Sequence, residues 1–144
     1  MKNCLLFLVA LLVTSCTALR PPEKQSTKPS PAPTAGTSAA VQITDATYEE
    51  VIRSQKIVLL LFWAPWSAPD RELMPIVDAL ANEYSDRVKV GKVDVDENPK
   101  LAQKFLIKGI PTLVILKDGI EQERTVGLVR KRTITDLLDK QLSN

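Results

Sequence analysis

The stretch IVLLLFWAPWSAPD, residues 57–70, decides the fold of this chain. Its first six residues are all apolar, which is typical of a strand that is buried on both faces of a sheet. Ser67 and Asp70 then give the pattern Ser-x-x-Asp, a signature of a helix start in which each side chain accepts a backbone hydrogen bond. We therefore predict a buried strand that runs through a short loop into a helix over residues 68–84.

The rest of the chain after residue 40 continues this alternation of strands and helices. Asp118-Gly119 lies between two strand-like runs and is a strong signal for a β-hairpin. Thr44 or Asp45 is a candidate cap for the first helix, and Thr133 for the last. The order predicts an α/β fold with a central mixed β-sheet flanked by helices on both faces. Strands are predicted at 41–44, 57–62, 88–96, 112–117 and 121–126, and helices at 46–55, 68–84, 98–106 and 133–142.

Composition excludes several classes of function. The 144 residues are enough for one domain, and 19 basic against 17 acidic side chains argue against a nucleic-acid-binding protein. There is no histidine, so the commonest general base and the commonest metal ligand are both absent. We expect no cofactor and no metal.

The N-terminus has the features of a secretion signal. Lys2 precedes a nine-residue apolar run at 5–13, which is too short to span a bilayer but suits the core of a signal peptide. The run ends in VTSC, which resembles the bacterial lipobox and implies cleavage before Cys16 and acylation of that residue. The alternative is an ordinary signal peptide that is cut after Ala18.

The chain divides into three parts on this interpretation. Residues 1–15 are a lipoprotein signal peptide, residues 16–40 a lipidated cysteine with a Pro-, Ser- and Thr-rich tether, and residues 41–144 a folded domain. Acyl chains contribute about 0.8 kcal/mol for each buried methylene, so acylated Cys16 would attach the protein stably to a lipid bilayer. Extended at about 3 Å per residue, the tether could hold the domain up to roughly 70 Å from the membrane. Because the other cysteine, Cys4, leaves with the signal, the mature protein would have no free thiol.

The folded part resembles the thioredoxin family, of the bacterial and plastid kind. The resemblance covers residues 41–144 and rests on landmarks in the family's order and spacing. It implies the thioredoxin fold. The landmarks are FWAPW after the central strand, Pro69 and Pro75 in the next helix, VDVDENP, GIPTLVILKDG, and Val126-Gly127.

The chain departs from the family at the residues that carry its reaction. The family motif is Trp-Cys-Gly-Pro-Cys, and here Ser67 and Asp70 replace both cysteines. The family usually has a buried Asp that assists proton transfer, and this chain has Leu61 at that position. A serine hydroxyl forms no disulfide and is hardly ionised near neutral pH. The resemblance therefore implies a redox-inactive member, with no catalytic residue expected.

Several roles remain open for Ser67 and Asp70. We interpret them as a helix cap, and we hypothesise an ion pair between Asp70 and Lys92, which matches the lysine that accompanies the family's Asp; alternatively, Lys92 points to solvent. A hydrolytic Ser67–Lys92 dyad would need a deprotonated lysine and an oxyanion hole, and the sequence indicates neither. A metal site of Asp70 with Asp94 or Asp96 finds little support, because strand carboxylates are expected to face solvent.

The family's peptide-binding face is better kept than its chemistry. The resemblance implies a groove that accepts an extended peptide by backbone pairing, next to a cis proline at position 111. The same residues could instead serve packing alone. Arg130-Lys131-Arg132 lies beside this face and could favour acidic partners or phospholipid headgroups, or be a solvated run of charge. The matching residues are Trp66, Ala68, Pro69, Ile110, Pro111, Val126 and Gly127.

We therefore predict a membrane-tethered, redox-inactive thioredoxin-like domain that binds or scaffolds proteins in the bacterial envelope. Its partner would be an envelope protein or an extended peptide segment, and the domain would be monomeric. If the cell is Gram-negative, Thr17 after the lipid cysteine favours the outer membrane. The alternatives are an oxidoreductase-family protein that assists disulfide exchange between the cysteines of its partners, and a purely structural envelope domain.

Overall fold

A computed structural model describes residues 40–143 of the chain. The predicted signal peptide and nearly all of the predicted tether, with Cys16, lie outside the described residues. The elements follow the predicted order of strands and helices. They are β1 Val41–Gln42, α1 Tyr48–Ser54, β2 Ile57–Trp63, α2 Ala68–Glu83, β3 Val88–Asp94, α3 Pro99–Lys104, β4 Thr112–Lys117, β5 Ile120–Val126 and α4 Lys131–Ser143.

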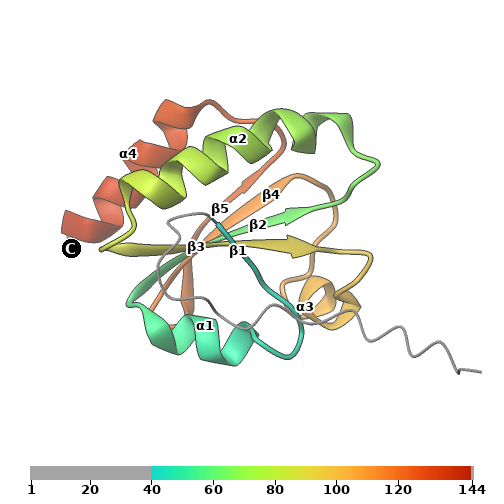
Figure 1. Cartoon of the computed structure of the whole chain (residues 1–144), viewed down its shortest axis with the longest axis horizontal. Coiled ribbons are helices and arrows are strands. Elements are labelled where there is room, and N and C mark those ends of the chain that lie inside the picture. Colours follow the sequence, from blue (N-terminus) through green and yellow to red (C-terminus); the bar gives the residue numbers. More distant parts are fainter. Residues whose placement is uncertain (1–39, 144) are drawn as a thin grey trace, which may run out of the picture. The chain divides into compact units, whose positions relative to one another are not determined.

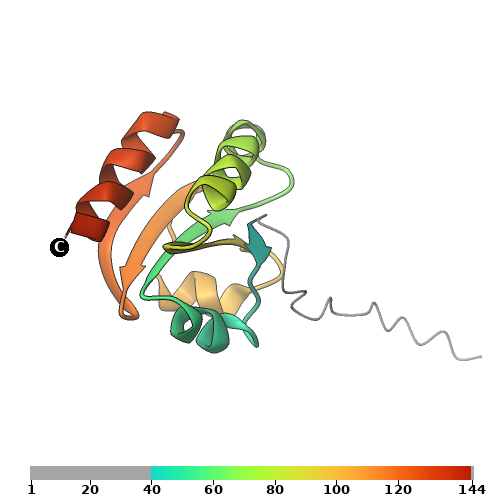
Figure 2. The same cartoon turned by 60° about the vertical axis from the view of Figure 1, so that its left-hand side comes forward.

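The strands form one mixed sheet in the spatial order β1-β3-β2-β4-β5. Strands β1, β3 and β2 run parallel to one another, while β4 is antiparallel to β2 and β5 is antiparallel to β4. Helices α2 and α4 cover one face of the sheet and α1 and α3 cover the other (Figure 1, Figure 2). The predicted mixed sheet with helices on both faces is confirmed.

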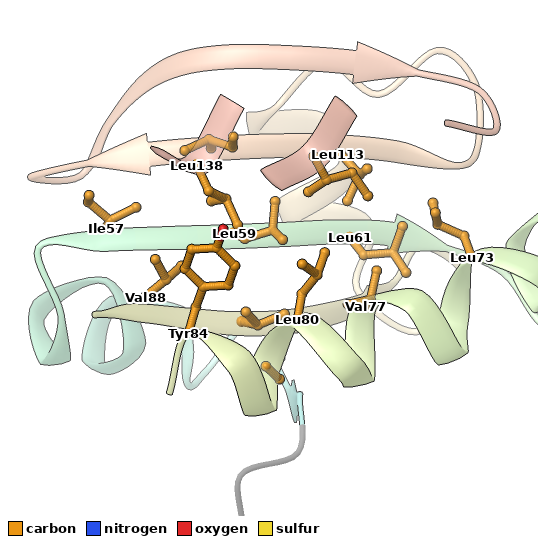
Figure 3. Packing of buried hydrophobic residues seen from close by; sticks show 14 residues of the cluster. Ile57, Leu59, Leu61, Leu73, Val77, Leu80, Tyr84, Val88, Leu113 and Leu138 are labelled. Carbon is orange, nitrogen blue, oxygen red and sulfur yellow. The ribbon is translucent and has the colours of Figure 1, made fainter. Parts of the chain in front are cut away.

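Strand β2 lies at the centre of the sheet and supplies side chains to both layers of the core. The side chains of Ile57, Leu59 and Leu61 pack against α2 and α4, as Figure 3 shows for this layer. Helix α2 presents Leu73, Val77 and Leu80 at the spacing of one helical face. Burying each large aliphatic side chain contributes about 1.5–3 kcal/mol, so this layer fixes α2 and the loop before it.

The opposite layer is built around aromatic contacts. The alternate residues of β2, with Phe62 at their end, face α1 and α3. The ring of Phe105 lies 5.2 Å from that of Phe62 and 5.7 Å from that of Tyr48, in tilted and edge-on arrangements that aromatic rings favour. Tyr48, at the first position of α1, thereby joins α1 to the end of α3.

Helix α1 begins later than predicted, and of its two predicted caps Asp45 is wrong. Thr44 Oγ1 accepts the backbone N–H of Thr47, at 3.3 Å, in the turn that leads into the helix. Thr47 is at the N-cap position, and its side chain makes no capping hydrogen bond. Asp45 acts elsewhere: its Oδ1 accepts the backbone N–H of Leu101, at 2.9 Å, in the first turn of α3. Asn98 Oδ1 in turn accepts the backbone N–H of Asp45, at 3.0 Å. Asp45 therefore caps a helix more than fifty residues away rather than the helix that follows it.

The C-terminal elements agree more closely with the sequence. Asp118 and Gly119 have φ values of +52° and +77°, the left-handed pair that a tight two-residue hairpin turn requires. Helix α4 begins at Lys131, two residues before the predicted start, so Thr133 lies inside the first turn and is not its cap.

Candidate functional site

The topology brings the segments of the predicted site to one edge of the sheet. Trp63, the last residue of β2, pairs with Asp94 at the end of β3. Phe62 pairs with Thr112 at the start of β4, and Thr112 pairs with Val126 at the end of β5. The loops that follow β2, β3 and β5, and the loop that precedes β4, therefore all lie at this edge.

Ser67 and Asp70 begin α2, but not with the hydrogen bonds that we predicted. Ser67 occupies the N-cap position in an extended conformation, and its side chain makes no capping hydrogen bond. Asp70 Oδ2 accepts the backbone N–H of Ala64, at 2.8 Å, and so reaches past Ser67 into the preceding loop. The position of the cap is confirmed and the reciprocal capping box is wrong. The carboxylate holds the loop onto the helix start, where the helix dipole favours a negative charge.

The side chains of Ser67 and Asp70, which the resemblance matches to the family's cysteines, are both buried. Ser67 is 6% exposed and Asp70 is 0% exposed. Asp70 Oδ1 has no hydrogen-bond partner among the described residues, and neither has the buried indole nitrogen of Trp63. Positions 67 and 70 therefore present neither a thiol nor an accessible carboxylate at the surface.

Lys92 pairs with Asp78 and not with Asp70. Lys92 Nζ lies 2.9 Å from Asp78 Oδ1, and the Lys92 side chain is only 17% exposed. Lys92 pairs in register with Leu61, whose side chain faces α2, so its ammonium group extends toward that helix. Asp78 lies on α2 two turns beyond Asp70 and meets the ammonium group there. The predicted Asp70–Lys92 pair, the solvent-pointing alternative and the Ser67–Lys92 dyad are all wrong.

The carboxylates after β3 position backbone and indole groups. Asp94 is buried, contrary to prediction, and its Oδ1 accepts the backbone N–H groups of Asp96 and Glu97 at 2.9 and 3.4 Å. Asp96 Oδ2 accepts the indole N–H of Trp66 at 2.8 Å. Within residues 40–143 no group of three His, Cys, Asp or Glu side chains could hold a metal ion. The hydrogen bond from Trp66 to Asp96 was not predicted. The position of Asp96 just after β3, at the same end of the strands as Trp66, could have indicated it.

Large apolar side chains are exposed around this buried centre. Trp66 is 69% exposed, Val126 62% and Leu128 51%. Leu128 was not predicted; its place directly after Val126-Gly127 could have indicated it. Ala68 and Pro69 are also exposed, whereas Ile110 and Gly127 are half-buried and Pro111 is buried. We call the following residues the apolar rim: Trp66, Ala68, Pro69, Ile110, Val126, Gly127 and Leu128.

The backbone of Ile110, which belongs to the apolar rim, has hydrogen-bonding groups that are unpaired within residues 40–143. The Ile110–Pro111 peptide bond is cis, as the family resemblance implied. The Pro111 carbonyl oxygen accepts the backbone N–H of Gly127, at 2.7 Å, which joins the two halves of the rim. Within the described part of the chain, neither the backbone N–H nor the C=O of Ile110 takes part in a hydrogen bond. One donor and one acceptor are thus available next to exposed apolar side chains.

One of the three residues of the basic run at the start of α4 makes a close ion pair with another element. Lys131 pairs with Glu83 of α2, and Arg132 lies 3.9 Å from Asp136 with its side chain 91% exposed. Arg130 makes no ion pair with any described residue. The run therefore braces α4 against α2 at one residue and is solvated at the other two.

None of the helices within residues 40–143 is long and apolar enough to cross a membrane.

Comparisons with known proteins agree with the fold. The sequence pattern of the family described as Thioredoxin matches residues 39–140. "Thioredoxin 1" of Synechococcus elongatus is 50% identical over 106 residues, which are 73% of this chain and 99% of that protein. "Thioredoxin 1" of Nostoc is 46% identical over 106 residues, which are again 73% of this chain and 99% of that protein. Among solved structures, a mutant thioredoxin from Halobacterium salinarum NRC-1 superimposes with a TM-score of 0.69 at 33% identity, and the match covers 74% of this chain and 94% of that one. The chain therefore belongs to the thioredoxin family.

Proposed function

We propose that this thioredoxin-family domain performs no thiol–disulfide exchange and instead holds an extended peptide segment of a partner protein in the bacterial envelope. One observation carries the proposal: the apolar rim and the open backbone of Ile110 surround a centre that has no reactive group. The family's reaction needs an attacking and a resolving thiolate. The only cysteines of the chain are Cys4 and Cys16, far from Ser67 and Asp70 in sequence.

The rim has the composition of a peptide-binding surface. Exposed clusters of large apolar side chains mark interaction sites, and aromatic residues dominate the binding energy of such sites. Covering one large apolar side chain contributes about 1.5–3 kcal/mol. Trp66, Val126 and Leu128 could thus supply most of the affinity, and the N–H and C=O of Ile110 could pair with the peptide backbone as in strand addition.

Membrane attachment is the second part of the proposal and rests on the sequence of the N-terminal segment. Acylated Cys16 would anchor the domain to a bacterial membrane, facing the periplasm or the exterior, at the end of the Pro-rich tether. Mass analysis of the N-terminal peptide of protein from envelopes tests this directly. We expect a diacylglyceryl group on Cys16, whereas an unmodified N-terminus after Ala18 would overturn the attachment and leave the peptide-binding proposal standing.

The binding proposal is tested with cysteine-free, unstructured peptides selected by display against the full chain. Binding is then titrated through tryptophan fluorescence, because the exposed Trp66 indole reports directly on the rim. Val126→Glu and Ile120→Glu form a matched pair, since these residues are 62% and 66% exposed and stand at opposite ends of β5. We expect Val126→Glu to weaken binding by about 30-fold or more, an effect of about 2 kcal/mol.

Ile120→Glu should leave the affinity unchanged. Equal losses in both variants, or no enriched peptide, would contradict a rim-dependent binding site and favour a purely structural domain. The unaltered chain should also reduce insulin no faster than dithiothreitol alone. Turnover above that background would overturn the redox-inactive assignment.

A further inference from the structure

A concave site lies at the ends of the strands opposite to the apolar rim. It has a volume of about 230 Å³ and is lined by Lys56, Ile57, Arg87, Lys117, Gln141 and Leu142. Here β2 and β3 begin and β4 ends, and the C-terminal ends of α2 and α4 come close to the same edge (Figure 1). Figure 3 shows Ile57, Val88 and Tyr84 together at this end of the core. We call this concavity the basic pocket.

The sheet register explains why three cations meet at this pocket. Ile57 pairs with Val88 on one side and with Lys117 on the other. Lys56 and Arg87 are the residues directly before Ile57 and Val88. Because neighbouring strands lie about 4.8 Å apart, the three cationic residues start from backbone positions that span only roughly 10 Å. Long side chains from these positions can converge on one small ligand.

No carboxylate of the described residues lies within ion-pair distance of these cations. Within residues 40–143, none of the three forms an ion pair, although Asp86 and Asp118 adjoin two of them in sequence. Lys117 Nζ donates to the backbone carbonyl oxygen of Gln141 at 3.0 Å, and the Arg87 guanidinium lies over the ring of Tyr84 at 5.1 Å. These contacts orient two of the cations and leave their charge available. Like charges that line one concavity repel one another, so an anion would relieve the repulsion.

We propose that the basic pocket binds the phosphate group of a phosphate monoester whose organic part is apolar. A phosphate monoester carries about −1.5 to −2 charges at pH 7, which matches three cations better than the single charge of a carboxylate. The planar guanidinium of Arg87 suits bidentate contact with phosphate oxygens. Ile57 and Leu142 supply the apolar wall on which the organic group would rest. This site is separate from the apolar rim and does not depend on the proposed peptide binding.

Thermal unfolding of the full chain measures the binding, since a ligand of the folded state raises the midpoint. Inorganic phosphate and butyl phosphate are the probes, each compared with sodium chloride at equal ionic strength. We expect both to raise the midpoint beyond chloride, with butyl phosphate effective at a lower concentration because of the apolar wall.

The double variant Lys56→Gln/Arg87→Gln removes two charges from the pocket, and Lys100→Gln/Lys108→Gln removes two exposed charges elsewhere as its matched control. The pocket variant should need at least about 10-fold more phosphate for the same shift of midpoint, as expected when charge-assisted contacts are lost. The control should respond as the unaltered chain does. If the pocket variant and the unaltered chain respond equally to phosphate, the effect is a general salt effect and the proposal is wrong.

The phosphate could belong to a soluble metabolite or to a lipid headgroup, and vesicles distinguish these sources. Binding of the full chain to phosphatidylcholine vesicles is compared with and without phosphatidic acid, whose headgroup is a phosphate monoester. A gain on phosphatidic acid that the pocket variant loses assigns the site to a lipid. A phosphate-dependent shift of the midpoint without this gain assigns it to a soluble ligand. Absence of both effects overturns the proposal.

Discussion

Among the described residues, Leu106 has the backbone conformation least suited to its side chain. Its φ is +50°, in the left-handed region, and its side chain is 71% exposed in the turn after α3. Holding an L-residue other than glycine in this region costs roughly 1–2 kcal/mol. An exposed leucine recovers little of that cost through packing. The chain therefore keeps an apolar side chain at a position where glycine would fit the backbone better.

Replacing Leu106 with glycine should make the folded state as stable as the unaltered protein or up to about 1 kcal/mol more stable. The relief of strain opposes the extra entropy that glycine gives the unfolded chain, which is about 0.5–1 kcal/mol. Chemical denaturation with linear extrapolation gives the free energy of unfolding. Leu128→Gly is the control, because Leu128 is also exposed but is not among the residues with positive φ. We expect that control to lose stability, and a greater loss at Leu106 than at Leu128 would contradict the strain argument.

Ser67 and Lys92 show which features of a residue the sequence predicts and which it does not. Spacing alone located Ser67 at the start of α2, and the structure confirms that position. The partner of Lys92 could not be read from spacing, because the choice between Asp70 and Asp78 depends on where β3 lies along α2. Every carboxylate on that face of the helix was a candidate until the register of β3 was known.

Removing one partner of an ion pair should lower the free energy of unfolding more where the other partner is buried. The Lys92–Asp78 pair joins β3 to α2, and its lysine is largely buried. Asp78→Asn would leave that ammonium group without its counter-charge, so we expect a loss of about 1–2 kcal/mol in the free energy of unfolding. Lys92→Met keeps the aliphatic stem and should cost less than about 1 kcal/mol. Urea denaturation of both variants measures this asymmetry.

Asp136→Asn is the control for this comparison. Its partner Arg132 is 91% exposed and 3.9 Å away, a geometry in which ion pairs contribute between zero and about 1 kcal/mol. A loss at Asp136 as large as that at Asp78 would show that burial of Lys92 is not the cause.

Tyr84 joins the end of α2 to α4 and should make the free energy of unfolding depend on pH in the alkaline range. Its hydroxyl donates to Asp139 Oδ1 at 2.9 Å, and burial, this hydrogen bond and the Asp139 charge raise the pKa of Tyr84 to about 12. In the unfolded chain the phenol titrates near pH 10. The contribution of Tyr84 is therefore fully present below about pH 10 and is lost as pH rises from 10 to 12, by at most about 1.4 kcal/mol per pH unit.

Tyr84→Phe should remove this pH-dependent component. Free energies of unfolding measured at pH 8, 10 and 11 should fall more steeply for the unaltered protein than for the variant above pH 10. Parallel curves would mean that the phenol is not held protonated by the fold.

Structural features were predictable where the signal lies in neighbouring residues of the sequence. The predictions failed where a feature depends on contacts between residues that are distant in sequence. The apolar run of β2 and the Asp118-Gly119 turn carry their own information, and both are confirmed. Asp45 is of a residue type that caps helices and lies just before α1, yet it caps α3, because the fold brings the backbone N–H of Leu101 within reach of its carboxylate. Local rules cannot weigh a competing hydrogen-bond donor that is distant in sequence.

At the scale of the whole molecule, the chain keeps the family's fold, with Ser67 and Asp70 at the positions that the resemblance matches to the family's cysteines. The order of elements, the sheet topology and the cis bond before Pro111 all agree with the resemblance. The sequence could predict this much because the landmarks are distributed over the entire domain. It could not predict exposure of the rim or the basic pocket, since both arise where several elements meet.

Restoring the two thiols should therefore restore part of the reaction. Ser67→Cys/Asp70→Cys places cysteines at the N-cap and at the third residue of α2, and we expect them to form an intramolecular disulfide under oxidising conditions. Insulin reduction should then exceed the dithiothreitol background by about 10-fold or more, yet stay below that of a typical thioredoxin, because Leu61 cannot transfer a proton.

Ser67→Cys/Asp70→Ser is the control, since one thiol alone cannot resolve a mixed disulfide. Insulin turbidity and thiol titration give the two readouts. If the double-cysteine variant forms the disulfide but stays inactive, then more than the reactive pair has changed at this edge.

The hydrogen bond between Trp66 and Asp96 has a consequence for the rate and selectivity of binding. An exposed tryptophan normally samples several rotamers and loses that freedom when a partner arrives. Here Asp96, itself held by Asp94, already restrains the indole in the free protein. The entropy of ordering, about 0.5–1.5 kcal/mol for such a side chain, is thus largely spent before any encounter. Because the indole N–H is engaged, a partner meets the apolar ring and no free donor, so Trp66 should select flat or aliphatic groups rather than hydrogen-bond acceptors.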